Sequence, residues 1–473
     1  MQFSLRSEPD HTPFPTMILI RTTFDRHILL SVVLALFLLV GCASTQNTTD
    51  DRTERPTNVI LMISDGAGPA TATMARDYAR AVLGRDGLAL DQIVVGTAQT
   101  YATDSRITDS AAGATAFSAG VKTYNGAIAM DTLRRPVATI LEAAEMRGMA
   151  TGLVATSRVT HATPASFASH VPSRSMENEI AEQMIGKGVD VIFGGGRRHF
   201  LSESAGGART DGRDLLEASR ELGYEVISTK EDFGGSLTTP VLGLFTVSDM
   251  SYDIDRSPSE EPSLAEMTAK ALDLLEDDPD GFFLMVEGSR IDHAGHGNDA
   301  AAHLHDMLAY DAAFAAALDF ARRDGRTLVI SVADHETGGL TLGRRGASGW
   351  NPDVLSRVRA SHGPIVSQLT EGADFESVLA TYAGIDDLSD EERELFETPG
   401  TESGALDAAL TQVVGHRAGV GWTTGGHTAV DVNLYAFGPG RESFIGNFDN
   451  AEVGRRIAEL MGLDLASATV ALQ

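Results

Sequence analysis

Residues 282–296 read FFLMVEGSRIDHAGH, an apolar run that ends in acidic and imidazole side chains. The first part, 282–287, shows no alternation of polar and apolar positions, which is typical of a strand covered by helices on both faces. Amphipathic stretches at 136–147, 176–186, 263–276 and 300–323 separate comparable runs, and the other candidate strands are 58–64, 151–155, 189–193, 225–228, 242–247, 327–333 and 432–437. This alternation predicts an α/β fold with three layers, α/β/α, around a large and mostly parallel central sheet.

Potential metal ligands follow several of these strands. In a parallel α/β sheet the carboxyl ends of the strands share one edge, and ligands bind there. Carboxylates with imidazoles are typical of zinc sites, and carboxylates with hydroxyls are typical of magnesium sites. Glycines in 288–297 predict a loose loop, and an ordinary solvated loop is the alternative to metal binding at that position. The candidate ligands at or near strand ends are Asp65, Glu287, Asp292, His296, Asp334, His335 and His427.

A second informative stretch is RITDSAAGATAFSAG, residues 106–120, which predicts a loop that turns into a helix of small residues. Ser110 stands where this helix begins, so free backbone N–H groups and the helix dipole favour an anion such as phosphate there. A plain N-cap is the alternative interpretation of such a serine. Arg174 is a candidate partner, because a planar guanidinium can hold two phosphate oxygens, although an isolated arginine is more often a surface residue.

The composition is that of an acidic globular protein. The 473 residues are 42% hydrophobic and 22% charged, with a formal net charge of −29. Such a charge argues against nucleic acid as a partner and against binding to acidic membrane surfaces. The length suits one large domain with an insertion.

The N-terminal segment resembles a bacterial lipoprotein signal. Arg21 and Arg26 precede the apolar run 28–40, which is too short to span a membrane but suits a signal peptide. The run ends just before Cys42, the only cysteine, so no disulfide can form within the chain. We expect residues 1–41 to be removed, Cys42 to carry a lipid, and residues 42–57 to form a flexible tether. The folded domain, 58–473, would then face the periplasm or the outside of a bacterial cell, attached to the cell envelope membrane only through the lipid.

The strand pattern stops between about 343 and 421, where glycines and prolines interrupt the chain. Ser389 and Glu392 have the spacing of a capping box and predict the start of a helix. We interpret 343–421 as an insertion that lies over the site, and a dimer contact is the alternative.

The motifs, taken in order, resemble those of the alkaline phosphatase family from about residue 58 to near the C-terminus. They are Asp65-Gly66, TDSAA at 108–112 with GVKTYNG at 120–126, Thr163-Pro164 with Arg174, VEG at 286–288, Asp292-His293 with His296, ADHET at 333–337, and Gly426-His427-Thr428. Residues 343–421 resemble the crown-like insertion of some members. The resemblance implies a homodimeric phosphomonoesterase that acts on small-molecule phosphate monoesters.

The resemblance also implies roles for single residues. Ser110 is the expected nucleophile, which forms a phosphoserine, and Arg174 is expected to hold the phosphoryl oxygens. Two Zn²⁺ ions are expected, the first on Asp292, His296 and His427 and the second on Asp65, Asp334 and His335. A Mg²⁺ ion is expected on Asp65, Thr163 and Glu287. The positions expected beside the substrate or this third ion are Asp109, His161 and His293.

Two of these positions differ from the best-studied enteric bacterial members, which carry Asp and Lys where this chain has His161 and His293. An imidazole in place of a carboxylate weakens the preference of the third site for Mg²⁺, so Zn²⁺ or Co²⁺ can compete there. The alternatives to a phosphomonoesterase are a related metal-dependent phosphodiesterase or phosphonate hydrolase of the same fold, and a non-catalytic envelope lipoprotein that binds phosphate or metal.

Overall fold

The computed structural model of the protein describes residues 55–346, 349–397 and 402–472. The predicted signal peptide, Cys42 and most of the predicted tether lie outside the described residues. Within the described ranges, none of the helices has the length and apolar character needed to cross a membrane.

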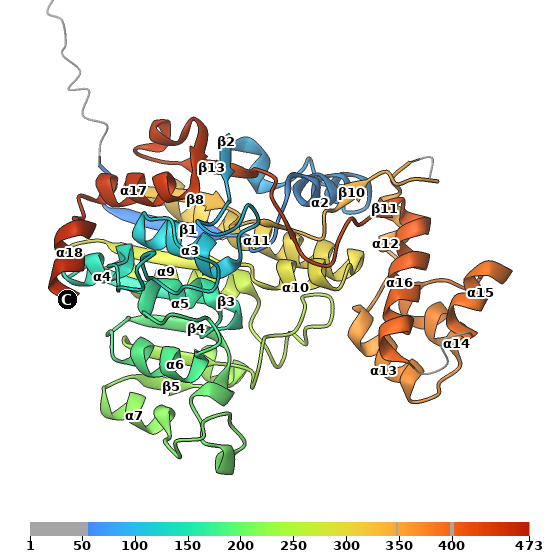
Figure 1. The fold of residues 1–473 in the computed structure, drawn as a ribbon, viewed down its shortest axis with the longest axis horizontal. Coiled ribbons are helices and arrows are strands. Elements are labelled where there is room, and N and C mark those ends of the chain that lie inside the picture. Colours follow the sequence, from blue (N-terminus) through green and yellow to red (C-terminus); the bar gives the residue numbers. More distant parts are fainter. Residues whose placement is uncertain (1–54, 347–348, 398–401, 473) are drawn as a thin grey trace, which may run out of the picture. The chain divides into compact units, whose positions relative to one another are not determined.

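The fold is organised around one sheet of ten strands, and the prediction of a large, mostly parallel sheet is confirmed (Figure 1). The strand order is β14-β2-β13-β8-β1-β7-β3-β4-β6-β5. Neighbouring strands run parallel except for β13, which is antiparallel to both β2 and β8. The strands of this sheet are β1 (Asn58–Ile63), β2 (Val94–Gln99), β3 (Ala150–Arg158), β4 (Val191–Gly195), β5 (Glu225–Ile227), β6 (Val241–Leu244), β7 (Phe282–Glu287), β8 (Thr327–Val332), β13 (Val432–Phe437) and β14 (Gly446–Asp449).

The centre of the sheet is apolar because helices cover it on both faces. Every residue of β1, β7 and β8 is buried, which is why these strands are mostly apolar and show no alternation of polar and apolar positions in the sequence. Each large apolar side chain buried in this way contributes about 1.5–3 kcal/mol. All the predicted strands are present. The sequence pattern missed β2 and β14, which lie at one end of the strand order and are partly exposed, so they lack a continuous apolar run.

Two groups of helices enclose the sheet between them (Figure 1). In one group α9 and α11 pack on each other, with α9 against β3 and β7 and α11 against β8. In the other group α3, α5 and α17 pack together, with α5 against β3 and β7 and α17 against β1. The helices outside the region 343–421 are α2 (Pro69–Ala81), α3 (Ser110–Ala119), α4 (Ile140–Glu145), α5 (Ala162–Ala168), α6 (Glu177–Ile185), α7 (Leu215–Glu221), α8 (Lys230–Phe233), α9 (Leu264–Leu275), α10 (Arg290–His296), α11 (Ala300–Asp324), α17 (Asn450–Met461) and α18 (Leu465–Leu472).

The region 343–421 is helical and is bounded by a short ribbon. β10 (Thr341–Leu342) pairs antiparallel with β11 (Val420–Gly421), so the chain leaves and returns at one place. The capping box is confirmed, because the Ser389 N–H donates to Glu392 Oε2 at 2.9 Å and the Glu392 N–H donates to Ser389 Oγ at 3.2 Å. Figure 1 shows these helices gathered to one side of the sheet, and the interpretation as an insertion over the site stays a prediction. They are α12 (Pro352–Leu355), α13 (His362–Thr370), α14 (Phe375–Val378), α15 (Asp390–Glu397) and α16 (Ser403–Ala418).

Candidate active site

Four adjacent parallel strands supply the candidate ligands. In the order β8, β1, β7, β3, these strands are neighbours at the centre of the sheet. Glu287 is the last residue of β7, Asp65 and Asp334 follow β1 and β8 by two residues, and His161 follows β3 by three. Parallel strands point their carboxyl ends the same way, so these side chains share one edge of the sheet. Gly66 permits the tight turn there: its φ is +76°, and an added Cβ would lie 2.7 Å from the Asp292 Cα.

The segment after β7 is a helix and not the loop that the glycines predicted. α10 begins at Arg290, two residues after Gly288, and contains Gly295. Gly295 packs closely against Thr337, where an added Cβ would lie 3.0 Å from the Thr337 Cγ2, so close packing explains this glycine. In a helix, residues four apart lie on one face. Asp292 Oδ2 is accordingly 3.4 Å from His296 Nε2.

His427 completes the first group of predicted ligands. It lies in β12 (His427–Thr428), which pairs antiparallel with β9 (Glu336–Thr337) and so brings His427 beside the residues that follow β8. His427 Nε2 is 3.1 Å from His296 Nε2 and 3.6 Å from Asp292 Oδ1. The Nδ1 atoms of both histidines bond to carbonyl oxygens, of Thr108 and Gly425, at 2.8 and 2.7 Å. A carbonyl only accepts, so both Nδ1 atoms carry a proton, and Nε2 is the nitrogen of each ring that is left to bind a metal.

The second group consists of Asp65, Asp334 and His335, which are all fully buried. His335 Nε2 is 3.3 Å from Asp334 Oδ2 and 3.6 Å from Asp65 Oδ1. Thr337 Oγ1 donates to Asp292, so it accepts from His335 Nδ1, 3.2 Å away, and the lone pair of His335 Nε2 points at the carboxylates. Burial and the nearby charge of Asp334 raise the pKa of Asp65 well above its usual value. Burial lowers the pKa of His335, so this imidazole is neutral.

The third group shares Asp65 with the second. Asp65, Glu287 and His161 each offer a ligand atom, and these atoms lie within 4.8 Å of one another. Thr163, in the first turn of α5, is fully buried, and its hydroxyl has no hydrogen-bond partner among the described residues. Burial raises the pKa of Glu287 to about 7. Asp65 and Glu287 of the predicted set therefore lie close together, with His161 as the third member of the group, and a role for Thr163 as a ligand stays a prediction.

The donor atoms of these groups fit divalent cations. Buried oxygens are normally hydrogen-bonded, because an unpartnered polar atom costs free energy. Among the described residues, both carboxylate oxygens of Asp65 and of Glu287, and Oδ2 of Asp334, lack any hydrogen-bond partner. A bound cation would give the unpartnered buried oxygens a partner, and it would also accept the histidine lone pair that points at the carboxylates.

Ser110 is the first residue of α3, at the predicted start of the helix, but it is not the N-cap residue. The cap is Asp109, whose carboxylate accepts from the Ala112 N–H at 3.0 Å. Ser110 is thus left free at the N-terminus of a helix whose residues are all buried. Its Oγ lies 3.2 Å from His335 Nε2, next to the second group. Helix dipole and free N–H groups favour an anion at this point.

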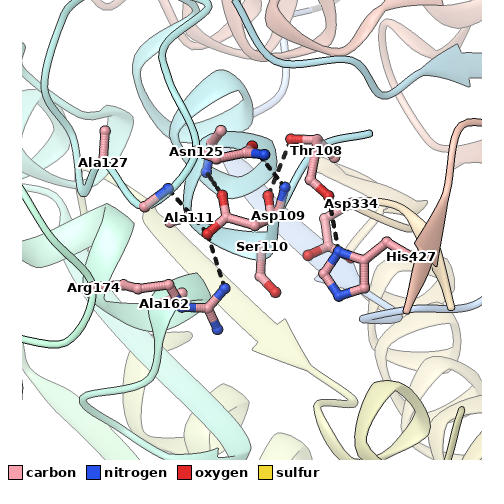
Figure 2. Close-up of polar contacts among 12 residues, drawn as sticks. Thr108, Asp109, Ser110, Ala111, Asn125, Ala127, Ala162, Arg174, Asp334 and His427 are labelled. Carbon is pink, nitrogen blue, oxygen red and sulfur yellow. Dashed lines mark hydrogen bonds and ion pairs between the residues drawn. The ribbon is translucent and has the colours of Figure 1, made fainter. Parts of the chain in front are cut away.

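Figure 2 shows Arg174 beside Ser110, with its guanidinium bonded to the Asp109 carboxylate. Nη1 donates to Asp109 Oδ2 at 3.0 Å, and Nη2 donates to His161 Nε2 at 2.8 Å. Burial, with the charge of Arg174 second, lowers the pKa of His161 well below its usual value. Neutral His161 that accepts at Nε2 carries its proton on Nδ1, and this buried Nδ1 has no hydrogen-bond partner among the described residues.

His293 packs against His161. The two rings meet edge to face with their centres 5.4 Å apart. Arg290 Nη1 donates to His293 Nδ1 at 2.6 Å, and the guanidinium carbon of Arg290 lies 3.8 Å from the centre of the Tyr252 ring. Burial and the charge of Arg290 lower the pKa of His293 to about 4, so His293 is neutral at physiological pH.

Sequence reasoning missed residues that orient the site. Asn125 Oδ1 accepts from the Asp109 N–H at 2.9 Å and its amide donates to the Ile107 carbonyl at 3.0 Å, which fixes the loop before Ser110 (Figure 2). Thr337 bonds both Asp292 and His335, and Arg290 bonds His293. These residues lie within or next to the quoted motifs, but only the folded chain shows which side chain each one holds.

Known proteins resemble this chain over most of its length. The model of the alkaline phosphatase family matches residues 56–463. The repressible alkaline phosphatase of Saccharomyces cerevisiae is 40% identical over 466 residues, which cover 87% of this chain and 82% of that protein. Alkaline phosphatase 3 of Bacillus subtilis is 40% identical over 430 residues, which cover 88% and 91%. The crystal structure of a cold-active alkaline phosphatase from a psychrophilic Shewanella species has a TM-score of 0.79 and 36% sequence identity, and covers 85% of this chain and 99% of that one.

Proposed function

The chain belongs to the alkaline phosphatase family and is a phosphomonoesterase, and from this premise we propose that it hydrolyses phosphate monoesters through a phosphoserine formed on Ser110. The observation that carries the proposal is the position of Ser110. Its hydroxyl lies at the free N-terminus of α3, 3.2 Å from His335 Nε2, with Arg174 anchored nearby on Asp109.

Membership of the family implies metal cofactors, and we propose two Zn²⁺ ions and one Mg²⁺ ion. Asp292, His296 and His427 would hold the first Zn²⁺, and Asp65, Asp334 and His335 the second. Asp65, Thr163 and Glu287 would hold Mg²⁺, since hydroxyl and carboxylate oxygens are ligands that this ion prefers. When bound, the ions supply the positive charge that favours ionised Ser110 and the departing alkoxide.

The reaction proceeds in two displacements at phosphorus. Ser110 Oγ attacks the phosphorus, its bond to phosphorus forms, and the bond to the leaving oxygen breaks in line with it. Water then attacks the phosphoserine, which releases inorganic phosphate and returns the hydroxyl to Ser110. Two inversions give net retention at phosphorus. The free N–H groups of α3 and the guanidinium of Arg174 hold the phosphoryl oxygens as charge spreads over them in the transition state.

His161 links the third metal site to Arg174. While His161 Nε2 accepts from Arg174, its Nδ1 carries the proton and cannot bind a metal. A metal bound at Nδ1 requires the proton to be on Nε2. The Nε2–H would then face an N–H of Arg174 across 2.8 Å, and neither group could accept a hydrogen bond from the other. An ion that prefers nitrogen, such as Zn²⁺ or Co²⁺, therefore competes with the bond that holds Arg174, and the oxygen-only set for Mg²⁺ does not.

A related phosphodiesterase is the second candidate, and Arg174 argues against it. The phosphoryl end of a monoester has three unesterified oxygens and two negative charges, whereas a diester has two such oxygens and one charge, so the positive guanidinium of Arg174 favours the monoester. The test is to remove metal with a chelator, restore Zn²⁺, Mg²⁺ and Co²⁺ one at a time, and compare p-nitrophenyl phosphate with its diester. Activity on the monoester that depends on Zn²⁺ supports the proposal. Hydrolysis of the diester alone, or metal-loaded protein that turns over neither ester, contradicts it.

We also propose that Cys42 carries a lipid, that the catalytic domain faces the periplasm or the outside of a bacterial cell, and that the protein is a homodimer. The signal-like run before Cys42 supports the anchor, and family resemblance supports the dimer. Mass spectrometry of the full-length protein from membranes tests the lipid, because an unmodified N-terminus at Cys42 or upstream would contradict it. Light scattering after size-exclusion chromatography gives the number of chains.

A further inference from the structure

An open cleft of about 620 Å³ lies beside the first group of candidate ligands. Three segments line it: His296 with the residues that follow α10, the ribbon of β10 and β11 with the residues next to it, and α16. Gly404, Ala408 and Thr411 contribute from α16, where their spacing puts them on one face of the helix. A cleft of this volume accommodates a small molecule.

The cleft carries uncompensated positive charge. Arg344 and Arg345 line it, and a guanidinium stays charged at any physiological pH. Neither guanidinium forms a salt bridge or a side-chain hydrogen bond with any residue that the structure describes. The two guanidinium groups are adjacent in the sequence and line the same cleft, so their positive charges add there.

The carboxylate among the described lining residues is already engaged. Asp407 Oδ1 is 2.9 Å from His362 Nδ1. Burial by itself disfavours a charged imidazole, but the negative charges of Asp299 and Asp407 outweigh it and raise the pKa of His362 above its usual value. Asp407 is thus bonded to His362 and forms no salt bridge with either arginine among the described residues, which leaves both guanidinium groups available for a ligand.

The position of the cleft connects it to the leaving group, an argument that rests on the proposed function. In an in-line displacement the departing oxygen lies opposite the attacking one. Ser110 Oγ stands beside His335, in the second group, so the proposed first Zn²⁺ site, with His296 and His427, is the one that would stabilise the departing oxygen. The side chain of His296 is 41% exposed and lines the cleft.

We propose that this cleft is a leaving-group subsite that selects phosphate monoesters whose alcohol carries a second oxyanion, foremost a second phosphate. Arg344 and Arg345 bind that oxyanion, since paired guanidinium groups match the oxygens of phosphate. The contribution of the two arginines to substrate binding falls as ionic strength rises, because the cleft is open to solvent.

The experiment compares two substrates that differ only in the distal group. The metal-loaded enzyme is assayed with the bisphosphates of propane-, butane- and hexanediol and with the corresponding hydroxyalkyl phosphates, at low salt. We expect kcat/KM to favour at least one bisphosphate about tenfold, after correction for its two equivalent ends. The double substitution R344Q/R345Q should remove this preference, while R344K/R345K, which keeps both charges, retains most of it.

The control is Arg359→Gln, which removes one positive charge from an exposed position outside the cleft lining and should leave the preference unchanged. All variants should hydrolyse the hydroxyalkyl phosphates at wild-type rates within about threefold. A wild-type enzyme that treats both substrate classes alike, or a preference that survives R344Q/R345Q, overturns the subsite and leaves the phosphomonoesterase intact. A metal-loaded wild type that hydrolyses no monoester would overturn the proposed function itself.

Discussion

Replacing Arg174 by alanine tests the phosphate clamp at a side chain that does not belong to any of the proposed metal sites. The guanidinium is held at both ends, by Asp109 Oδ2 at 3.0 Å and by His161 Nε2 at 2.8 Å, so it is pre-positioned for two oxygens of the substrate. A charge-assisted hydrogen bond contributes about 1.5–3 kcal/mol. The side chain is 30% exposed, which screens the charge, so we expect the lower part of that range, about 2 kcal/mol in total. The inhibition constant for phosphate should then rise about 30-fold.

The assay measures competitive inhibition by phosphate and kcat/KM for p-nitrophenyl phosphate and its diester in the metal-loaded Arg174→Ala enzyme. The diester should lose much less than the monoester, because it presents fewer free oxygens. Arg106→Ala is the matched control: it removes an exposed positive charge from the loop before Ser110 and should change phosphate inhibition by less than about twofold. Equal phosphate inhibition in Arg174→Ala and wild type would refute the clamp, as would an equal loss for monoester and diester.

Three further predictions concern metal and stability. In His161→Asp the third site gains a carboxylate, so activity should depend more strongly on Mg²⁺, and a metal profile identical to wild type would speak against this. Chelation should lower the melting temperature by several degrees, because each site filled at a thousandfold excess over Kd adds about 4 kcal/mol; an unchanged melting curve after verified metal loss would argue that the groups hold no metal. Although burial opposes ionisation, His170 and Lys187 lower the pKa of Glu142 to about 2, below its usual 4.5. This pair of interactions therefore stabilises the fold above pH 4.5 by up to about 3 kcal/mol and loses that contribution as the pH falls towards 2. Glu142→Gln should be less stable than wild type to urea at pH 7, with the difference shrinking in acid; a difference independent of pH would contradict the assignment.

Much of the architecture could be predicted because burial of a strand between two layers of helices requires apolar side chains, and these are visible in the sequence. Strands such as β7 are covered on both faces, so every residue before Glu287 is apolar and the run is visible without any structure. The convergence of Asp65, Glu287 and Asp334 follows from the same parallel sheet, whose strands point their carboxyl ends to one edge.

What could not be predicted depends on contacts between distant segments. Gly295 has a low helix propensity, and only its packing on Thr337 shows why α10 tolerates it. Local sequence places Ser110 near a helix start, but the cap is Asp109, and that carboxylate also holds Arg174, far along the chain. The tautomer of His161 depends on Arg174 in the same way, so no motif could reveal the competition between metal and clamp at this imidazole.

In the proposed mechanism Ser110 becomes phosphorylated in each catalytic cycle. The most direct measurement is rapid acid quenching of the metal-loaded enzyme with a monoester labelled in its phosphoryl group, followed by peptide mass spectrometry. We expect a single acid-stable phosphate on Ser110, absent from Ser110→Ala, which should retain its metal content and lose most of its activity. A label on another residue, or normal turnover by Ser110→Ala, would contradict it.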